Sequence, residues 1–174
     1  KLTQLRTMSS EAKEVYHNYK PLKSLNSRAI RKTFHGARGS GKTSTLGVDQ
    51  YQCFWELPRA TNVIGGLTYV QLDSVVLPGI LASLERLNIH EYNKAQPYGV
   101  YVLGVKPPDH WGTPYQKVGK KGYQYAMTFI NGYTIRFVSQ DNPNTHRGIN
   151  SDLIRIDESA TMDEDFINTV LSPT

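Results

Sequence analysis

The sequence predicts an α/β fold in which a mainly parallel sheet is flanked by helices and extended by a β-hairpin. Three observations predict it. A glycine-rich stretch from Gly36 to Thr43 lies between a short apolar run and a helical pattern. Asn131-Gly132 separates two strand-like runs. A third apolar run, residues 153–156, stops at two carboxylates. The length of 174 residues predicts one domain spanning residues 1–174.

The first elements are expected to be short. Residues 9–19 predict a helix with a serine N-cap, followed by a linker at Lys20-Pro21. Residues 29–35 predict a strand leading into the glycine-rich stretch. Arg31 and Lys32 interrupt its apolar pattern, which is unusual for a strand buried on both faces.

Helical and extended patterns alternate after the glycine-rich stretch. Residues 42–57 predict a helix, residues 61–66 a short strand ending in glycines, and residues 68–89 a second helix. Pro78-Gly79 should break or kink that second helix.

The second half predicts mainly extended structure. Residues 98–105 predict a strand, and residues 106–122 a loop rich in proline and glycine. A hairpin follows over residues 123–139, with both residues of Asn131-Gly132 expected at positive φ.

The chain then returns to the sheet. Residues 141–152 have loop composition, Leu153–Ile156 predict a strand, and residues 163–171 predict a final helix with acidic residues in its first turn.

The glycine-rich stretch GARGSGKT fits the phosphate-loop pattern GxxxxGK[ST]. Glycines let several backbone N–H groups point at one anion, and the following helix adds the positive end of its dipole. Lys42 would reach the β- and γ-phosphates, and the Thr43 hydroxyl can ligate Mg²⁺. The stretch predicts ATP and Mg²⁺ as cofactors. The expected cofactor-binding residues are Gly36, Ala37, Arg38, Gly39, Ser40, Gly41, Lys42, Thr43 and Ser44.

Asp157 and Glu158 predict the other half of a hydrolytic site. Both follow the strand over Leu153–Ile156, where the chain can turn so that both acids approach one ligand. Asp157 is expected to hold the Mg²⁺ shell together with Thr43, and Glu158 to polarise the water that attacks the γ-phosphate. A charged strand end or a helix N-cap is the alternative, which the phosphate loop disfavours. Arg155 within the strand suggests one face less covered than usual.

The composition of the chain limits its possible partners and functions further. Residues 1–50 carry ten Lys and Arg against three Asp and Glu, a net +7, while the rest carries −2, which gives the total of +5. Part of this excess could face nucleic acid or an acidic neighbouring subunit, or simply solvent. Cys53, the single cysteine, is expected to be a buried small hydrophobe. No long apolar run is present, so no membrane partner is expected.

The motifs together resemble the ATPase domain of terminase large subunits, the DNA-packaging motors of tailed phages. The similarity rests on GARGSGKT, with Arg38 inside the loop, and on NGYTIRFVSQDNPNTHRGINSDLIRIDESA. It covers residues 28–161. It implies a P-loop NTPase of the ASCE type, with the hairpin placed before the Walker B strand, and catalytic roles for Glu158, Arg147 and Arg38.

The resemblance also implies roles for two arginines, and it implies partners for the chain. Arg38 would contact the γ-phosphate, and Arg147 would act in trans on a neighbouring subunit's nucleotide, unless it caps a loop or pairs with Asp152. The implied partners are double-stranded DNA, further copies in a ring, the viral portal and the small terminase subunit. The implied location is the host cytoplasm and, transiently, the procapsid portal. We expect the coupling motif and the nuclease domain to lie beyond Thr174, and no nuclease activity here.

Two other functions fit the motifs. One is a helicase-like P-loop ATPase, and the other is a nucleotide-dependent assembly module without turnover. The segment 111–125 mixes three lysines with aromatic residues, which suits nucleic acid, a solvent loop or a subunit contact.

Overall fold

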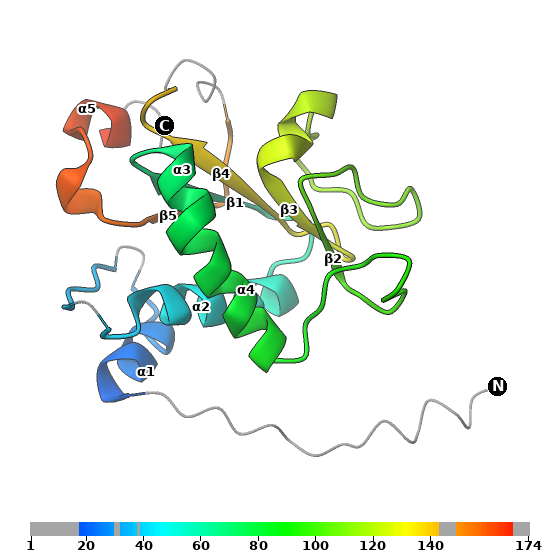
Figure 1. Ribbon diagram of the computed structural model, residues 1–174. Helices are drawn as coiled ribbons and strands as arrows, with labels where there is room; N and C mark the ends of the chain where they lie inside the picture. The colour runs from blue at the N-terminus through cyan, green and yellow to red at the C-terminus, as the bar shows by residue number, and fades with distance from the viewer. Residues whose placement is uncertain (1–17, 30–31, 38, 143–148, 169–174) are drawn as a thin grey trace.

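The computed structural model describes residues 18–29, 32–37, 39–142 and 149–168. Helices and strands are interspersed along the chain (Figure 1). In order, the elements are α1 (Tyr19–Leu25), α2 (Lys42–Glu56), β1 (Thr61–Gly66), α3 (Tyr69–Gln71), η2 (Leu72–Val76), α4 (Leu77–Arg86), β2 (Tyr101–Leu103), η3 (Lys120–Tyr125), β3 (Ala126–Phe129), β4 (Thr134–Ser139), β5 (Leu153–Ile156), η5 (Ser159–Thr161) and α5 (Glu164–Phe166).

The five strands form one sheet in the order β2-β3-β4-β1-β5. β1 pairs in parallel with β4 on one side and with β5 on the other. β2, β3 and β4 pair antiparallel. The α/β prediction is confirmed, but the sheet is mixed rather than mainly parallel, because the hairpin and β2 contribute as many antiparallel pairings as there are parallel ones.

The strand predicted over residues 29–35 is not found in its described part, Ala29 and residues 32–35. Lys32, Thr33 and His35 are exposed, and the Lys32 amine donates to the Ser24 carbonyl at 3.3 Å. A charged side chain that bonds outside the sheet does not suit a strand buried on both faces. β5 is therefore an edge strand among the described residues, and β2 is the edge strand on the other side of the sheet.

The hairpin is confirmed, with a different turn from the one predicted. Gly132 has φ +84°, but Asn131 is not at positive φ. The Gly132 N–H donates to the Phe129 carbonyl at 2.8 Å, and the Phe129 N–H donates to the Tyr133 carbonyl at 2.8 Å. This is a turn followed by a left-handed glycine, which is common in three-residue hairpin loops. Asn131 instead accepts the Tyr133 N–H through its side chain at 3.0 Å.

The helix predicted over residues 68–89 is neither broken nor split at Pro78-Gly79. α3, η2 and α4 follow one another without interruption from Tyr69 to Arg86. Pro78 lies in the first turn of α4, and the preceding five residues form a π-helix in which the Leu77 N–H donates to the Leu72 carbonyl. The chain thus passes from a π-turn into α4 at the proline without leaving the helix.

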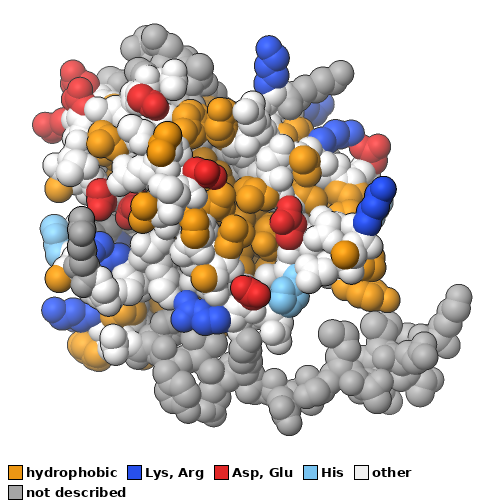
Figure 2. Space-filling view, in the orientation of Figure 1, with side chains coloured by type: hydrophobic (Ala, Val, Ile, Leu, Met, Phe, Trp, Pro, Cys, Tyr) orange, Lys and Arg blue, Asp and Glu red, His pale blue; other side chains and the backbone are white. Residues whose placement is uncertain are grey.

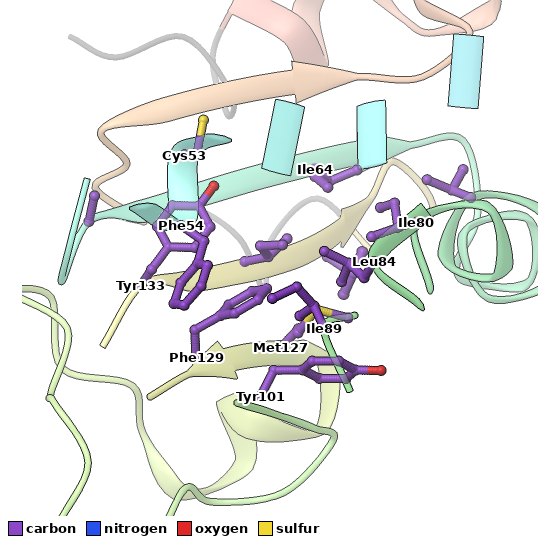
Figure 3. Packing of buried hydrophobic residues seen from close by; sticks show 14 of the residues in the cluster. Cys53, Phe54, Ile64, Ile80, Leu84, Ile89, Tyr101, Met127, Phe129 and Tyr133 are labelled. Atoms are coloured by element: carbon purple, nitrogen blue, oxygen red, sulfur yellow. The ribbon is translucent and has the colours of Figure 1, made fainter. Parts of the chain in front are cut away.

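Two helices cover one face of the sheet. Phe54 of α2 stacks on Phe129 of β3 with ring centroids 4.8 Å apart, and Ile80 and Leu84 of α4 are fully buried in the same core (Figure 3). On the opposite face, Val63 and Val138 pack against residues around α5; the buried members there are Met162 and Phe166. The sheet therefore has apolar cover on both sides.

Polar contacts fix α2 on the sheet. Arg155 of β5 forms a bidentate ion pair with Asp49, with N–O distances of 2.7 and 3.2 Å. Gln50, fully buried, accepts hydrogen bonds from the Asn62 amide and from the Tyr133 hydroxyl. The face of β5 that carries Arg155 is thus covered by α2, although every residue of β5 is only half-buried.

The remaining predictions have mixed outcomes. The strand predicted over residues 98–105 is shorter, β2 at Tyr101–Leu103. Lys20-Pro21 is part of α1 and not a linker, because proline is tolerated in the first turn of a helix. The final helix begins at Glu164 with Asp163 as its N-cap. The helix predicted at residues 9–19 lies outside the described residues up to residue 17, as does the end of the final helix beyond residue 168.

Within the described ranges, no helix combines the length and apolar character that crossing a membrane requires. Cys53 is buried, as predicted, and burial is the largest effect that raises the pKa of its thiol to about 11, followed by the charge of Asp49.

Candidate nucleotide site

The carboxyl ends of β1, β4 and β5 meet at one edge of the sheet, since these three strands are parallel. β1 lies between the other two, and its chain leaves the sheet at Gly66 for α3. The carboxyl end of α2 connects to the amino end of β1, so the first turn of α2 lies toward the carboxyl ends of the parallel strands. In open α/β sheets, ligands bind at the carboxyl ends of the strands, where the connections from neighbouring strands leave in opposite directions.

The phosphate loop has the backbone that its glycines predict. Gly39 and Gly41 have φ of +75° and +82°, conformations that other residues rarely adopt. Gly41 is the N-cap of α2. Gly41 therefore starts a 15-residue helix, whose amino end carries the positive end of the helix dipole.

Lys42 folds back across this loop. Its amine donates to the Gly36 carbonyl at 2.7 Å and to the Ala37 carbonyl at 3.1 Å. These neutral acceptors hold the ammonium group within the curve of the loop. A phosphate oxygen placed there would be a stronger partner, because hydrogen bonds between charged groups are about twice as strong as neutral ones.

Ser40 supplies a direct indication that the loop suits a polar ligand. Its hydroxyl is buried and has no hydrogen-bond partner among the described residues. It lies against Gly36, where a Cβ atom would overlap it. Buried polar atoms are nearly always paired, so this unpaired hydroxyl fits a polar ligand in the loop.

Thr43 and Ser44 contact α4. A Cβ atom on Gly79 would lie 2.5 Å from Cγ2 of Thr43, so the glycine lets α4 approach the start of α2 closely. The Ser44 hydroxyl accepts a hydrogen bond from Arg86 at 2.6 Å. α4 thus packs directly on the residues predicted to bind phosphate and metal.

Asp157 and Glu158 follow β5, as predicted. The Asp157 N–H continues the ladder to the Gly65 carbonyl at 3.0 Å. Burial, and secondly the charge of Glu158, raise the pKa of Asp157, while the charge of Lys42 acts in the opposite direction. Both predicted motifs thus lie toward the same carboxyl edge of the sheet, where Lys42 begins α2 and Asp157 follows β5.

Glu158 has a left-handed backbone, with φ +52° and ψ +44°. Such conformations in residues other than glycine are uncommon and occur often at functional positions. Its carboxylate accepts a hydrogen bond from the Gln71 amide at 2.8 Å. Thr68, the N-cap of α3, accepts the Gln71 N–H at 3.1 Å and fixes the segment that carries this amide.

Sequence reasoning missed Gln71. The residue fits no motif, and 87 positions separate it from Glu158. The available signal was Thr68, a helix cap immediately after β1, which places the following turn at the carboxyl edge of the sheet.

The described residues suit a magnesium–nucleotide complex in part. They include no group of three or more His, Cys, Asp and Glu side chains of the kind that holds a metal by itself. Mg²⁺ usually keeps several waters and takes one or two carboxylates together with phosphate oxygens. Thr43 and Asp157 would be sufficient protein ligands in that arrangement, and the unpaired Ser40 hydroxyl fits a phosphate neighbour. Arg38 and Arg147, the two predicted catalytic arginines, lie outside the described residues.

Comparisons with known proteins give no relative: no family model, no curated protein and no solved structure matches this chain.

Proposed function

We propose that this chain is the ATP-binding and ATP-hydrolysing motor domain of a viral DNA-packaging terminase, which powers movement of double-stranded DNA into a capsid. The observation that carries the ATPase part is the Glu158 carboxylate held by Gln71 at the carboxyl edge of the sheet, toward which the first turn of α2 and Lys42 also lie. A phosphate-binding cation, a carboxylate for metal and a second carboxylate for water are the parts that nucleotide hydrolysis requires.

Each residue has a definite role in this proposal. Lys42 exchanges its loop carbonyls for β- and γ-phosphate oxygens. Thr43 and Asp157 would hold Mg²⁺, which would neutralise charge on the phosphates. Glu158, oriented by Gln71, accepts a proton from the water whose oxygen attacks the γ-phosphorus. The bond from that phosphorus to the bridging oxygen breaks, and ADP leaves.

The motor part of the proposal rests on the sequence resemblance. Arg38 inside the phosphate loop and Arg147 before β5 match arginines of the terminase family. A guanidinium suits the developing phosphoryl charge, and in a ring of subunits Arg147 would serve the neighbouring nucleotide. The ring would act on DNA at the viral portal together with a small terminase subunit.

Two variants separate binding from hydrolysis. Lys42→Ala should weaken ATP binding, measured with a fluorescent ATP analogue, whereas Glu158→Gln should bind it normally and hydrolyse ATP at least about a hundredfold more slowly. Lys32→Ala is the matched control, because Lys32 is an exposed lysine near the loop with a single contact to Ser24. Undiminished hydrolysis by Glu158→Gln contradicts the catalytic assignment.

A mixing experiment tests the arginine in trans. Arg147→Ala subunits should be inactive alone, and so should Glu158→Gln subunits. Activity recovered on mixing supports a shared site between neighbours, and an Arg147→Ala protein that is fully active by itself excludes it.

A further inference from the structure

The first turn of α2 packs directly on α4. The two helices approach closely at two glycines, because Gly79 of α4 lies against Thr43, and Gly47 of α2 lies against Ser83. The Ser83 hydroxyl lies 3.3 Å from the Ser44 carbonyl and 2.9 Å from the Gly79 carbonyl, within hydrogen-bonding distance of both. Side chains of α4 therefore reach the residues that are proposed to bind phosphate and metal.

Arg86, the last residue of α4, brings a cation to this turn. Its Nη2 atom donates to the Ser44 hydroxyl at 2.6 Å and to the Ser83 hydroxyl at 3.1 Å. Its Nε atom donates to the Ala82 carbonyl at 3.3 Å. All three acceptors are neutral, so they hold the guanidinium in place without balancing its charge. A phosphate oxygen would be a stronger partner, because hydrogen bonds between charged groups are about twice as strong as neutral ones.

Arg86 keeps donors that these contacts do not use. A guanidinium carries five N–H groups, and no hydrogen bond of Nη1 and no ion pair of Arg86 is found within the described part of the chain. The Ser44 hydroxyl accepts from Arg86 and so retains its own O–H for donation. Arg86 is exposed, and the carboxyl end of α4 lies at the surface, where acidic and basic side chains both appear (Figure 2). Arg86 and Ser44 together offer donors to an anion that arrives from solvent.

The place of Ser44 in α2 indicates which anion this is. Lys42 is proposed to reach the β- and γ-phosphates, and Thr43 to ligate Mg²⁺, whereas the backbone of a phosphate loop surrounds the α- and β-phosphates. Ser44 lies one residue further into the helix than Thr43, away from the γ-phosphate end. The planar fork of an arginine matches two oxygens of one phosphate, which a lysine does not.

We propose that Arg86 is a phosphate-binding residue of the nucleotide site, supplied by the same chain, and that it contacts the α- or β-phosphate beside Ser44. This inference rests on the proposed function, because it assigns a further residue to the same site. A purely structural role, in which Arg86 only fastens α4 to α2, would use the same three hydrogen bonds without a ligand. The two roles differ in what happens when the charge is removed and the contact is kept.

Arg86→Gln makes that change, since a glutamine amide can still donate to the Ser44 hydroxyl. Affinities are measured with fluorescent analogues of ATP and ADP, and stability by urea denaturation. We expect both analogues to bind about tenfold more weakly, the equivalent of one hydrogen bond to a charged group, with the free energy of unfolding close to that of the native chain. Arg86→Lys keeps the charge but not the fork and should recover part of the affinity.

Arg59→Gln is the matched control. It removes the same charge and one contact to a carbonyl, that of Thr113, but Arg59 lies before β1 at the opposite edge of the sheet. It should bind both analogues as the native chain does. Equal affinities of Arg86→Gln and Arg59→Gln overturn the proposal. So does a loss of affinity in Arg86→Gln that comes with a loss of stability and that Arg86→Lys does not reduce, because this pattern indicates fastening alone.

The two nucleotides decide which phosphate is contacted. A loss confined to the ATP analogue indicates the γ-phosphate and overturns the assignment to the phosphates that ADP retains. A native chain that binds neither analogue overturns the proposed function and the role of Arg86 together. A native chain that binds both but hydrolyses no ATP overturns only the hydrolytic part of the proposed function, and the affinities still decide the role of Arg86.

Discussion

The Nε2 atom of Gln71 lies 2.8 Å from Oε2 of Glu158, although 87 positions separate the two residues along the chain. Glu158 is exposed and has a left-handed backbone. An exposed glutamate ordinarily samples several rotamers, so a fixed amide donor restricts where its carboxylate points. In the proposed function Glu158 is the general base, and Gln71 would orient it through this hydrogen bond.

Replacement of Gln71 should therefore reduce turnover more than binding. For Gln71→Ala we expect kcat for ATP hydrolysis to fall about 10- to 100-fold, the equivalent of one hydrogen bond to a charged group, with KM for ATP nearly unchanged. Steady-state kinetics measure both constants. Gln71→Glu keeps the length but replaces the donor with a like charge, and it should be at least as slow. An equal change in kcat and KM, or none, contradicts the positioning role.

The ion pair between Asp49 and Arg155 should support the fold. Both side chains are mostly buried, at 18% and 27% exposed, and the contact is bidentate. Asp49→Ala would leave Arg155 without its carboxylate, and we expect a loss of about 2 kcal/mol in the free energy of unfolding, less than for a fully buried pair. Urea denaturation measures it. Asp49→Leu/Arg155→Leu should lose less than Asp49→Ala, because no unpaired charge remains. A larger loss in the double variant contradicts the account.

Local sequence signals predicted the elements whose chemistry is local. α2 begins where the glycine of the phosphate loop ends, because Gly41 caps the helix, and the hairpin forms where Asn131-Gly132 permits a tight turn. β5 ends at Asp157 as its apolar run predicts. Each of these elements depends on residues within a few positions of one another. The phosphate-loop pattern and the Asp157-Glu158 pair could therefore be located from the sequence.

Features that depend on distant contacts could not be predicted. The amide of Gln71 contacts Glu158 only because β1 and β5 pair. Arg155 interrupts an apolar strand pattern, and the reason is its ion pair with Asp49 of α2. The strand over residues 29–35 was predicted from a short apolar run, but Lys32 bonds to Ser24 instead. At Pro78-Gly79, where a break or a kink was expected, the helix continues and a π-turn precedes the proline. Tertiary packing decided each case.

Close packing of α2 on α4 should be sensitive to one methyl group. A Cβ atom on Gly47 would lie 2.5 Å from Cβ of Ser83 and 3.1 Å from Cα of Ile80, and the second of these is backbone. For Gly47→Ala we expect a net loss of about 1–2 kcal/mol in stability, since overpacking costs up to about 3 and the better helix propensity of alanine returns about 1.

Gly119→Ala is the matched control, because nothing lies within 4 Å of a Cβ atom there and φ is −66°. It should be neutral or slightly stabilising. Thermal unfolding of both variants checks the contrast, and a Gly47→Ala protein as stable as Gly119→Ala would show that the two helices can separate without cost.

The raised pKa of Asp157 should make this residue destabilising at neutral pH. Its folded-state pKa is raised, first by burial and then by Glu158, so the folded chain holds the proton more tightly than the unfolded chain. Stability therefore falls as pH rises through the folded pKa, and the whole cost is present at pH values above it. Asp157→Asn removes the charge and should raise the unfolding midpoint near neutral pH while abolishing metal-dependent ATP hydrolysis.

The pH dependence separates this cause from a general effect of lost charge. The advantage of Asp157→Asn should shrink as pH falls through the pKa of Asp157, because the native carboxyl then becomes neutral as well. Asp73→Asn, at an exposed acid of η2, should change the midpoint little at any pH. Thermal melts of the three proteins over a pH series give the comparison. A constant difference between native and Asp157→Asn at all pH values means that the charge of Asp157 is not what costs stability, and that packing of the amide is responsible instead.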